Sequence, residues 1–260
     1  MSRLDSPLPD ILAESRRILS NADEGGLTLR LLGGVAVRFV CPSAAKEALS
    51  RGYRDADFAG RASETRELKA LFAELGYEPR EAFNAMQGGR RLIFNDMGNG
   101  RRVDVFLDYF EMCHKLDLRR RIKLRAETLA LADLLETKLQ IVQMNDKDYR
   151  DIIALLIDHE LGQDDEADKI NLAHIVGLCS EDWGIYRTFT GSLEKVIGSL
   201  ERYDLEQADR DAAEKRARKL LAAIEGAPKT LKWKLRARVG ERAAWYETPE
   251  SDAAVVDSRF

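Results

Sequence analysis

The chain of 260 residues has few cysteines, few histidines and no long apolar run. Its three cysteines, Cys41, Cys113 and Cys179, are far apart and odd in number, which excludes a disulfide framework and predicts reduced, buried thiols. The three histidines show no spacing typical of a zinc site. No apolar stretch approaches the roughly 20 residues that cross a bilayer, and residues 2–7 are too polar for the apolar part of a signal peptide. These absences predict a cytoplasmic protein without a membrane contact.

The net charge of −4 hides an uneven distribution. Between Glu214 and Arg242 the chain has ten lysines and arginines against three glutamates, a local excess of +7 that leaves −11 for the remainder. Such a basic segment can contact a nucleic acid, or it can form a solvated helix face that pairs with the acidic body. The sequence favours the second reading and leaves the first open.

The first half of the chain alternates between helical and extended patterns. Apolar spacing predicts helices over residues 9–21, 34–41 and 64–75, and strands over residues 27–32, 54–59, 91–94 and 102–107. The nearly continuous apolar run of the first strand indicates a central position. Turn-forming residues 95–100 join the last two strands into a hairpin. This order predicts an α/β (α+β) fold in which helices flank a mixed sheet.

From residue 133 onward the patterns are helical. Asp133 is a plausible N-cap for a helix over residues 134–142, and Asn145 or Asp146 for the next one. Further helices are expected within residues 169–179 and 183–200 and over residues 205–224. The sequence therefore predicts a core domain over residues 1–132, a helical domain over residues 133–247 and a disordered tail over residues 248–260.

Three aspartates lie in segments that are predicted to be strands. Asp55 and Asp57 are separated by one residue, so on a strand they point to the same face. Asp104 lies between Val103 and Val105, where burial of a carboxylate is costly unless it is paired or bound to a metal. Neighbouring carboxylates repel one another unless they share a cation, and Mg²⁺ bound by carboxylates and substrate phosphates is the usual solution. The spacing predicts that Asp55 and Asp57 share a cation, and the surroundings of Asp104 indicate that it is paired or bound to a metal.

Two glycines, Gly33 and Gly34, follow the first predicted strand and open the next helix. Backbone without a Cβ can approach a phosphate closely, and the free amides of a helix N-terminus bind anions. Arg51 and Arg54 lie just before the acid pair. An arginine there can bind a phosphate or neutralise the aspartates, and the sequence does not separate these roles.

The paired glycines after a strand, the acid pair Asp55 and Asp57, and the third acid Asp104 together resemble the signature of the DNA polymerase beta-like nucleotidyltransferase superfamily. The resemblance implies a nucleotidyltransferase-type mixed sheet. It also implies an enzyme that moves a nucleoside monophosphate from an NTP to a hydroxyl group and releases pyrophosphate. Asp55, Asp57 and Asp104 would be the catalytic ligands of two Mg²⁺ ions, and Gly33 and Gly34 would meet the triphosphate.

Two downstream segments, residues 134–139 and 147–152, resemble the pattern of bacterial abortive-infection nucleotidyltransferase toxins. Those proteins have Arg-x-(Ser/Thr)-x-Asp-x-Asp at the metal strand, and this chain keeps the arginine as Arg51 but has Tyr53 at the third place. The resemblance implies that Lys138 contacts the triphosphate of ATP or another NTP. It implies that Asp148 organises the site or activates the acceptor, and that a cognate antitoxin is a candidate partner.

Several acceptors are compatible with this reading. The basic segment favours an anionic acceptor such as tRNA, and a protein hydroxyl is a further candidate. The acidic body instead suits a cationic antibiotic as acceptor. A different class of function is also open, namely a catalytically silent protein of the same fold that binds a nucleotide or a partner. The intact set of three acids favours the enzyme.

Overall fold

The computed structural model describes residues 6–166 and 168–248, so the predicted tail, except for Thr248, lies outside the described residues. The helices are α1 (Ile11–Glu24), α2 (Gly33–Val40), α3 (Thr65–Glu74), α4 (Glu81–Gln87), α5 (Leu131–Leu139), α6 (Asp146–Asp158), α7 (Leu172–Glu181), α8 (Trp183–Ser199), α9 (Gln207–Gly226) and α10 (Leu231–Val239). The strands are β1 (Leu29–Leu32), β2 (Asp55–Gly60), β3 (Glu78–Pro79), β4 (Arg91–Asp96), β5 (Arg101–Leu107), β6 (Tyr109–Glu111), β7 (Lys115–Asp117), β8 (Glu160–Gly162) and β9 (Lys169–Asn171). Within the described ranges, no helix is both long and apolar enough to span a membrane.

The main sheet has five strands in the order β1-β2-β5-β4-β3. Strands β2 and β5 are parallel and the other neighbours are antiparallel, which confirms the predicted mixed sheet and the β4–β5 hairpin. The prediction that the first strand is central is wrong, because β1 lies at the edge. Its leucines are nevertheless buried in the core, where β1 contacts α1 and α2, and a later loop bonds to its open edge: Leu31 N donates to Glu127 O at 2.8 Å, and Leu129 N donates to Leu31 O at 2.9 Å.

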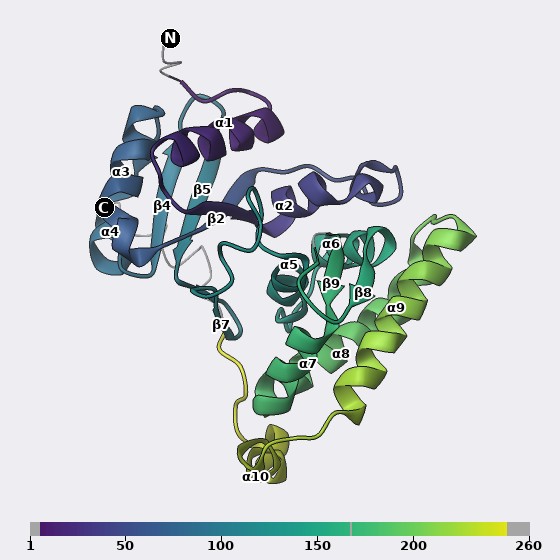
Figure 1. Cartoon of the computed structure of the whole chain (residues 1–260). Coiled ribbons are helices and arrows are strands. Elements are labelled where there is room, and N and C mark those ends of the chain that lie inside the picture. Colours follow the sequence, from purple (N-terminus) through teal and green to yellow (C-terminus); the bar gives the residue numbers. More distant parts are fainter. Residues whose placement is uncertain (1–5, 167, 249–260) are drawn as a thin grey trace.

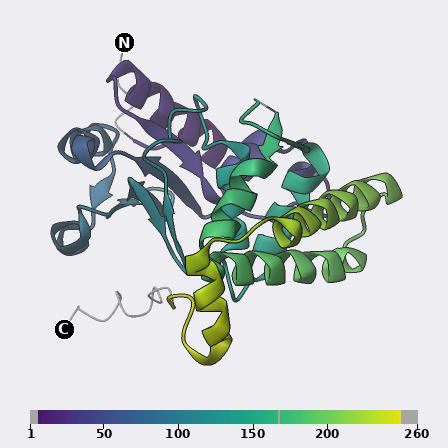
Figure 2. The same cartoon turned by 60° about the horizontal axis from the view of Figure 1, so that its bottom comes forward.

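The sheet and the later helices occupy two halves of the molecule. Figure 1 shows α3 and α4 beside the sheet, the helices α5 to α9 gathered in the other half, and α2 between them. Helices α8 and α9 run side by side, which is clearest in Figure 2. One continuous apolar core nevertheless includes residues of both halves. The domain boundary predicted between residues 132 and 133 falls inside α5, which packs against α2 and α6.

Helix caps show where local sequence signals succeed and fail. The prediction that Asp133 is an N-cap is wrong: Ala130 caps α5, and Asp133 is buried in the first turn. The helix begins earlier than predicted because Leu131 and Ala132 are also buried against the core. Asn145 does cap α6, as one of the two predicted candidates. Its side chain accepts from Lys147 N at 2.9 Å, in a capping box with Asp148.

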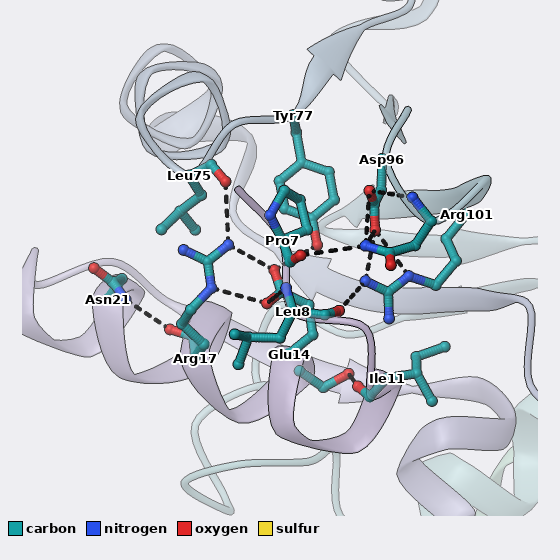
Figure 3. Close-up of polar contacts among 12 residues, drawn as sticks. Pro7, Leu8, Ile11, Glu14, Arg17, Asn21, Leu75, Tyr77, Asp96 and Arg101 are labelled. Carbon is teal, nitrogen blue, oxygen red and sulfur yellow. Dashed lines mark hydrogen bonds and ion pairs between the residues drawn. The ribbon is translucent and has the colours of Figure 1, made fainter. Parts of the chain in front are cut away.

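A buried polar network attaches α1 to the sheet half (Figure 3). The carboxylate of Glu14, only 2% exposed, accepts hydrogen bonds from Arg17 Nε at 2.8 Å, from the Tyr77 hydroxyl at 2.7 Å and from Leu8 N at 2.9 Å. Because a buried charge is costly unless it is paired and hydrogen-bonded, these three partners are what make Glu14 tolerable inside the protein. They fix α1 in place beside the sheet.

The same network includes an ion pair at the tip of the hairpin. Asp96 is buried and lies 2.5 Å from Arg101 Nη2, and Arg101 also donates to the carbonyl groups of Leu8 and Pro9. Burial alone would raise the pKa of Asp96, but hydrogen bonds from Arg101 and Asn99 outweigh it and hold the pKa below its usual value. The pair therefore joins β4, β5 and the segment before α1.

We expect Asp96→Asn to lower the free energy of unfolding by about 3 kcal/mol at pH 7, because it leaves Arg101 buried without its partner. Since the folded pKa of Asp96 is lowered, its contribution is present in full above the ordinary carboxyl pKa of about 3.9 and is lost as the pH falls through the folded value. Urea denaturation at pH 7, 5 and 3.5 measures this.

The matched control is Asp204→Asn, at an exposed position before α9, which should change the stability by less than about 0.5 kcal/mol. The difference between the wild type and Asp96→Asn should be constant from pH 7 to 5 and smaller at pH 3.5. An equal effect of the two substitutions would contradict the role of the ion pair.

Candidate functional site

The three predicted acids converge because of strand register. Strands β2 and β5 are parallel neighbours, and their register places Asp57 directly opposite Asp104. Residues that face each other across a sheet point to the same side, and Asp55, two residues earlier, shares that side. Asp104 is fully buried, Asp57 is partly buried and Asp55 is exposed. The acids thus form a row that runs from the interior to solvent.

Asp104 is compensated by two arginines. Arg91 Nε donates to its Oδ1 at 2.8 Å, and Arg102 Nε donates to its Oδ2 at 2.8 Å. Burial raises the pKa of Asp104, and the two guanidinium groups oppose that effect without cancelling it. Each carboxylate oxygen can still accept another contact, because an oxygen offers two lone pairs. Asp104 is therefore held in a fixed orientation, but its oxygens are already engaged.

Asp57 is in the opposite situation. Across the described part of the chain, its carboxylate makes no hydrogen bond or ion pair, and neither does that of Asp55. Burial and the nearby charge of Asp104 raise the pKa of Asp57 to about 7, and the charge of Lys138 partly opposes this rise. A carboxylate that is disfavoured in this way gains from any cation placed beside it. The oxygen donors of Asp55 and Asp57 fit Mg²⁺, which prefers carboxylate ligands.

The paired glycines make room for protein side chains. Gly33 has φ +71°, and a Cβ there would lie 2.3 Å from Asp57 Oδ2. A Cβ on Gly34 would lie 1.7 Å from Arg51 Nη2. The two glycines therefore let the positive end of α2 approach the Asp57 carboxylate, and they let the Arg51 guanidinium lie against the first turn. The space beside the two glycines, which was predicted to meet a triphosphate, is thus taken up by the side chains of Asp57 and Arg51.

Arg51 binds an aspartate that the sequence analysis left without a functional role. Its Nε and Nη2 atoms donate to Asp151 Oδ1 at 3.0 Å and Oδ2 at 2.8 Å, a bidentate pair between the loop before β2 and α6. Lys138 Nζ of α5 lies 2.9 Å from the same Asp151 Oδ2. Asp151 thus joins two of the predicted site residues. Its signal was the acid spacing of three residues after Asp148, which places both acids on one side of a helix.

Lys138 remains a cation inside this cluster. Its side chain is 12% exposed, and burial alone would lower its pKa, but Asp151 and Asp148 raise the pKa by a larger amount. Asp148 has two roles in the structure. Its Oδ2 accepts from Asn145 N at 3.1 Å as part of the helix cap, and its Oδ1 lies 3.8 Å from Lys138 Nζ. The helical half of the chain therefore supplies positive charge next to the acids of the sheet.

The structure connects all eight predicted site residues in one cluster, which we call the acid–cation cluster and which also includes Asp151. Strand pairing links Asp104 to Asp57 and, through β2, to Asp55. Asp57 lies against Gly33, and Arg51 lies against the next residue, Gly34. Ion pairs then connect Arg51 to Asp151, Asp151 to Lys138, and Lys138 to Asp148. No protein-family model, curated protein or solved structure matches this chain. The function of the protein is therefore inferred from the geometry and the residue chemistry of the cluster alone.

The basic segment over residues 214–242 divides into two parts. In α9, Arg216 donates to Leu156 O at 2.7 Å and pairs with Glu160, as expected for a helix that packs on the body. In α10, Lys232, Lys234 and Arg238 are exposed. A cavity of about 730 Å³ beside α10 is lined by Lys232 and Arg236 and by three tryptophans: Trp183 of α8, Trp233 of α10 and Trp245 of the segment after α10.

We expect Gly33→Ala to lower the free energy of unfolding by about 2 kcal/mol. An alanine at φ +71° is strained, by roughly 1–2 kcal/mol, and its Cβ must also displace the Asp57 carboxylate. Gly52→Ala is the matched control, because a Cβ at Gly52 meets open space and its φ is not left-handed. Urea denaturation of both variants measures the difference, and similar stabilities would argue against the close approach of α2 to Asp57.

Proposed function

We propose that the protein is a Mg²⁺-dependent nucleotidyltransferase that moves a nucleoside monophosphate from an NTP to a hydroxyl acceptor. The observation that carries the proposal is the register of β2 and β5, which sets Asp57 opposite Asp104 with Asp55 beside it and the N-terminus of α2 in contact. Oxygen ligands on one face, with two of three carboxylates lacking partners among residues 6–166 and 168–248, fit the magnesium sites that bind nucleotide phosphates. Bound Mg²⁺ would stabilise the attacking and leaving oxygens of an in-line displacement.

The side chains have separate roles in this proposal. Asp55 and Asp57 hold the metal, and Asp104 is oriented by Arg91 and Arg102 at the buried end of the row. The acceptor hydroxyl oxygen forms a bond to the α-phosphorus, its proton goes to solvent or to a nearby base, and the bond to pyrophosphate breaks. Lys138, a buried ammonium group close to Asp57, offsets the charge of the triphosphate.

Arg51 positions this lysine indirectly. It shares Asp151 with Lys138, so the two cations are held by one carboxylate at the junction of the sheet and the helical half. The bidentate pair with Arg51 prevents the Asp151 carboxylate from rotating. The fixed carboxylate in turn holds the ammonium group of Lys138 in place. We assign Arg51 as a positioning residue, because its guanidinium is already occupied by Asp151 on one side and by Gly34 on the other.

An RNA such as tRNA is the acceptor class that the surface favours. Helix α10 carries four basic residues and no acid, and its exposed Lys232 lines the cavity with three tryptophans, which also has acidic residues on its wall. Basic side chains that follow a phosphate backbone, together with aromatic rings that stack on bases, are typical of proteins that bind single-stranded RNA.

The first test is transfer of label. The full chain is incubated with Mg²⁺, each α-³²P-labelled NTP in turn, and total RNA or a protein extract. We expect Mg²⁺-dependent label in the RNA fraction and at least about a 10³-fold loss of transfer in Asp57→Asn, equivalent to about 4 kcal/mol of transition-state stabilisation. Asp204→Asn should retain full transfer. Label in protein would change the acceptor, and no Mg²⁺-dependent label in any fraction would contradict the proposal.

One observation favours the second candidate, a catalytically silent nucleotide-binding protein. Both oxygens of Asp104 hold an arginine, so this acid is already neutralised without a metal. Titration calorimetry with Mg²⁺ and each NTP separates the two candidates. For an enzyme, NTP binding should depend on Mg²⁺ and weaken at least about tenfold in Asp55→Asn. Binding that is independent of both the metal and Asp55 would support the silent protein.

A further inference from the structure

A second group of metal-ligating side chains lies in the helical half, between α5 and α7 (Figure 1). Asp133 and Glu136 are three residues apart on α5, and His174 lies near the start of α7. One ligand atom from each of the three residues lies within 4.8 Å of the other two. Asp133 and Glu136 are each only 2% exposed, whereas the His174 side chain is 24% exposed.

Two oxygen atoms of this group lack a hydrogen bond within the described part of the chain. Asp133 Oδ2 and Glu136 Oε1 are buried without a hydrogen bond to any described residue. Glu136 Oε1 lies 3.4 Å from His174 Nε2, and His174 Nε2 lies 3.9 Å from Asp133 Oδ1. Buried polar atoms are almost always satisfied by protein, water or an ion, so two unsatisfied carboxylate oxygens in one place indicate a missing ligand.

The protein charges nearby do not balance the carboxylates. Arg121 Nε pairs with Asp133 Oδ1 at 2.7 Å, but the two remaining nitrogens of its guanidinium pair with Asp165 at 2.9 and 2.7 Å. One positive charge is thus shared between Asp133 and Asp165, and Glu136 receives none of these bonds. A proton on His174 or a divalent cation would complete the balance.

The unpartnered oxygens favour a cation over a proton alone, and the spacing of the group can accommodate one. Four-coordinate zinc has ligand bonds of about 2.0–2.1 Å, and tetrahedral angles then separate the ligand atoms by about 3.3–3.4 Å. The Glu136 Oε1–His174 Nε2 distance of 3.4 Å agrees with this separation, whereas the 3.9 Å between His174 Nε2 and Asp133 Oδ1 is longer and would shorten on binding. Arg121 holds the other oxygen of Asp133, which leaves Oδ2 free, and such hydrogen bonds to ligating carboxylates are typical around metals.

We propose that Asp133, Glu136 and His174 bind one divalent transition-metal ion, with Zn²⁺ as the best-fitting species, at a site separate from the acid–cation cluster. Two carboxylates and an imidazole are three protein ligands, and a water completes the coordination. The ion ties α7 to α5, the helix that also carries Lys138. Because the ligands come from two helices, metal binding stabilises the helical half of the fold.

The test uses the full chain after treatment with EDTA, titrated with Zn²⁺ by calorimetry and monitored by thermal unfolding. We expect one strongly bound ion per chain and a rise in Tm of about 5–10 °C when free Zn²⁺ is a hundredfold above Kd. Co²⁺ in place of Zn²⁺ should give the visible absorption of a tetrahedral ion. In His174→Gln and Glu136→Gln we expect at least about a tenfold loss of affinity and, at the same Zn²⁺ concentration, a rise in Tm of about half the wild-type value or less.

Two controls make the result specific. His114→Gln replaces another partly buried histidine outside the group, and Asp57→Asn removes a carboxylate of the acid–cation cluster; both should bind Zn²⁺ as the wild type does. If Glu136→Gln does not fold, as judged by circular dichroism, the more exposed His174→Gln decides the question. Absence of Zn²⁺ binding by the wild type, unchanged binding by His174→Gln, or loss of binding in Asp57→Asn would each overturn the proposal.

Discussion

The parallel pairing of β2 with β5 is the constraint on which the site depends. It brings two carboxylates from residues 47 positions apart in the chain into direct opposition inside the protein. Like charges in that position repel strongly, because the interior screens them poorly. Arginine side chains compensate the charge of Asp104, but no arginine pairs with Asp57 within the described residues. Because of this unequal compensation, Asp57 would gain from a cation placed beside it, whereas the oxygens of Asp104 are already engaged.

The helical half takes part in this balance. Its α5 and α6 bring Lys138 and Asp151 to the loop that carries Arg51, and the close approach of Arg51 requires a glycine at position 34. A single carboxylate, Asp151, therefore orders two cations that come from different parts of the chain. Asp151 is buried, and the two cations keep its pKa below the usual value although burial acts to raise it. Positive charge is thereby fixed next to the acids without neutralising Asp57 directly.

Local signals in the sequence predicted much of the fold. The β4–β5 hairpin follows from its turn residues, the capping box of α6 from Asn145, and the same-face placement of Asp55 and Asp57 from their spacing. The gathering of the site residues was predicted by motif resemblance and not by physics, and their catalytic roles stay predictions. Positions that depend on distant partners were missed. Strand β1 lies at the edge, where it bonds to a loop almost a hundred residues later, and Asp133 is drawn into α5 by the burial around it.

The apolar core that passes through both halves has a consequence for how the chain is divided. A cut between residues 132 and 133 would break the first turn of α5 and disturb the contacts of that helix with α2 and α6. Each fragment would then present to water the apolar surface that the other now covers, and neither would retain a complete interior. The shared core therefore makes the two sequence regions depend on each other for burial of their apolar side chains.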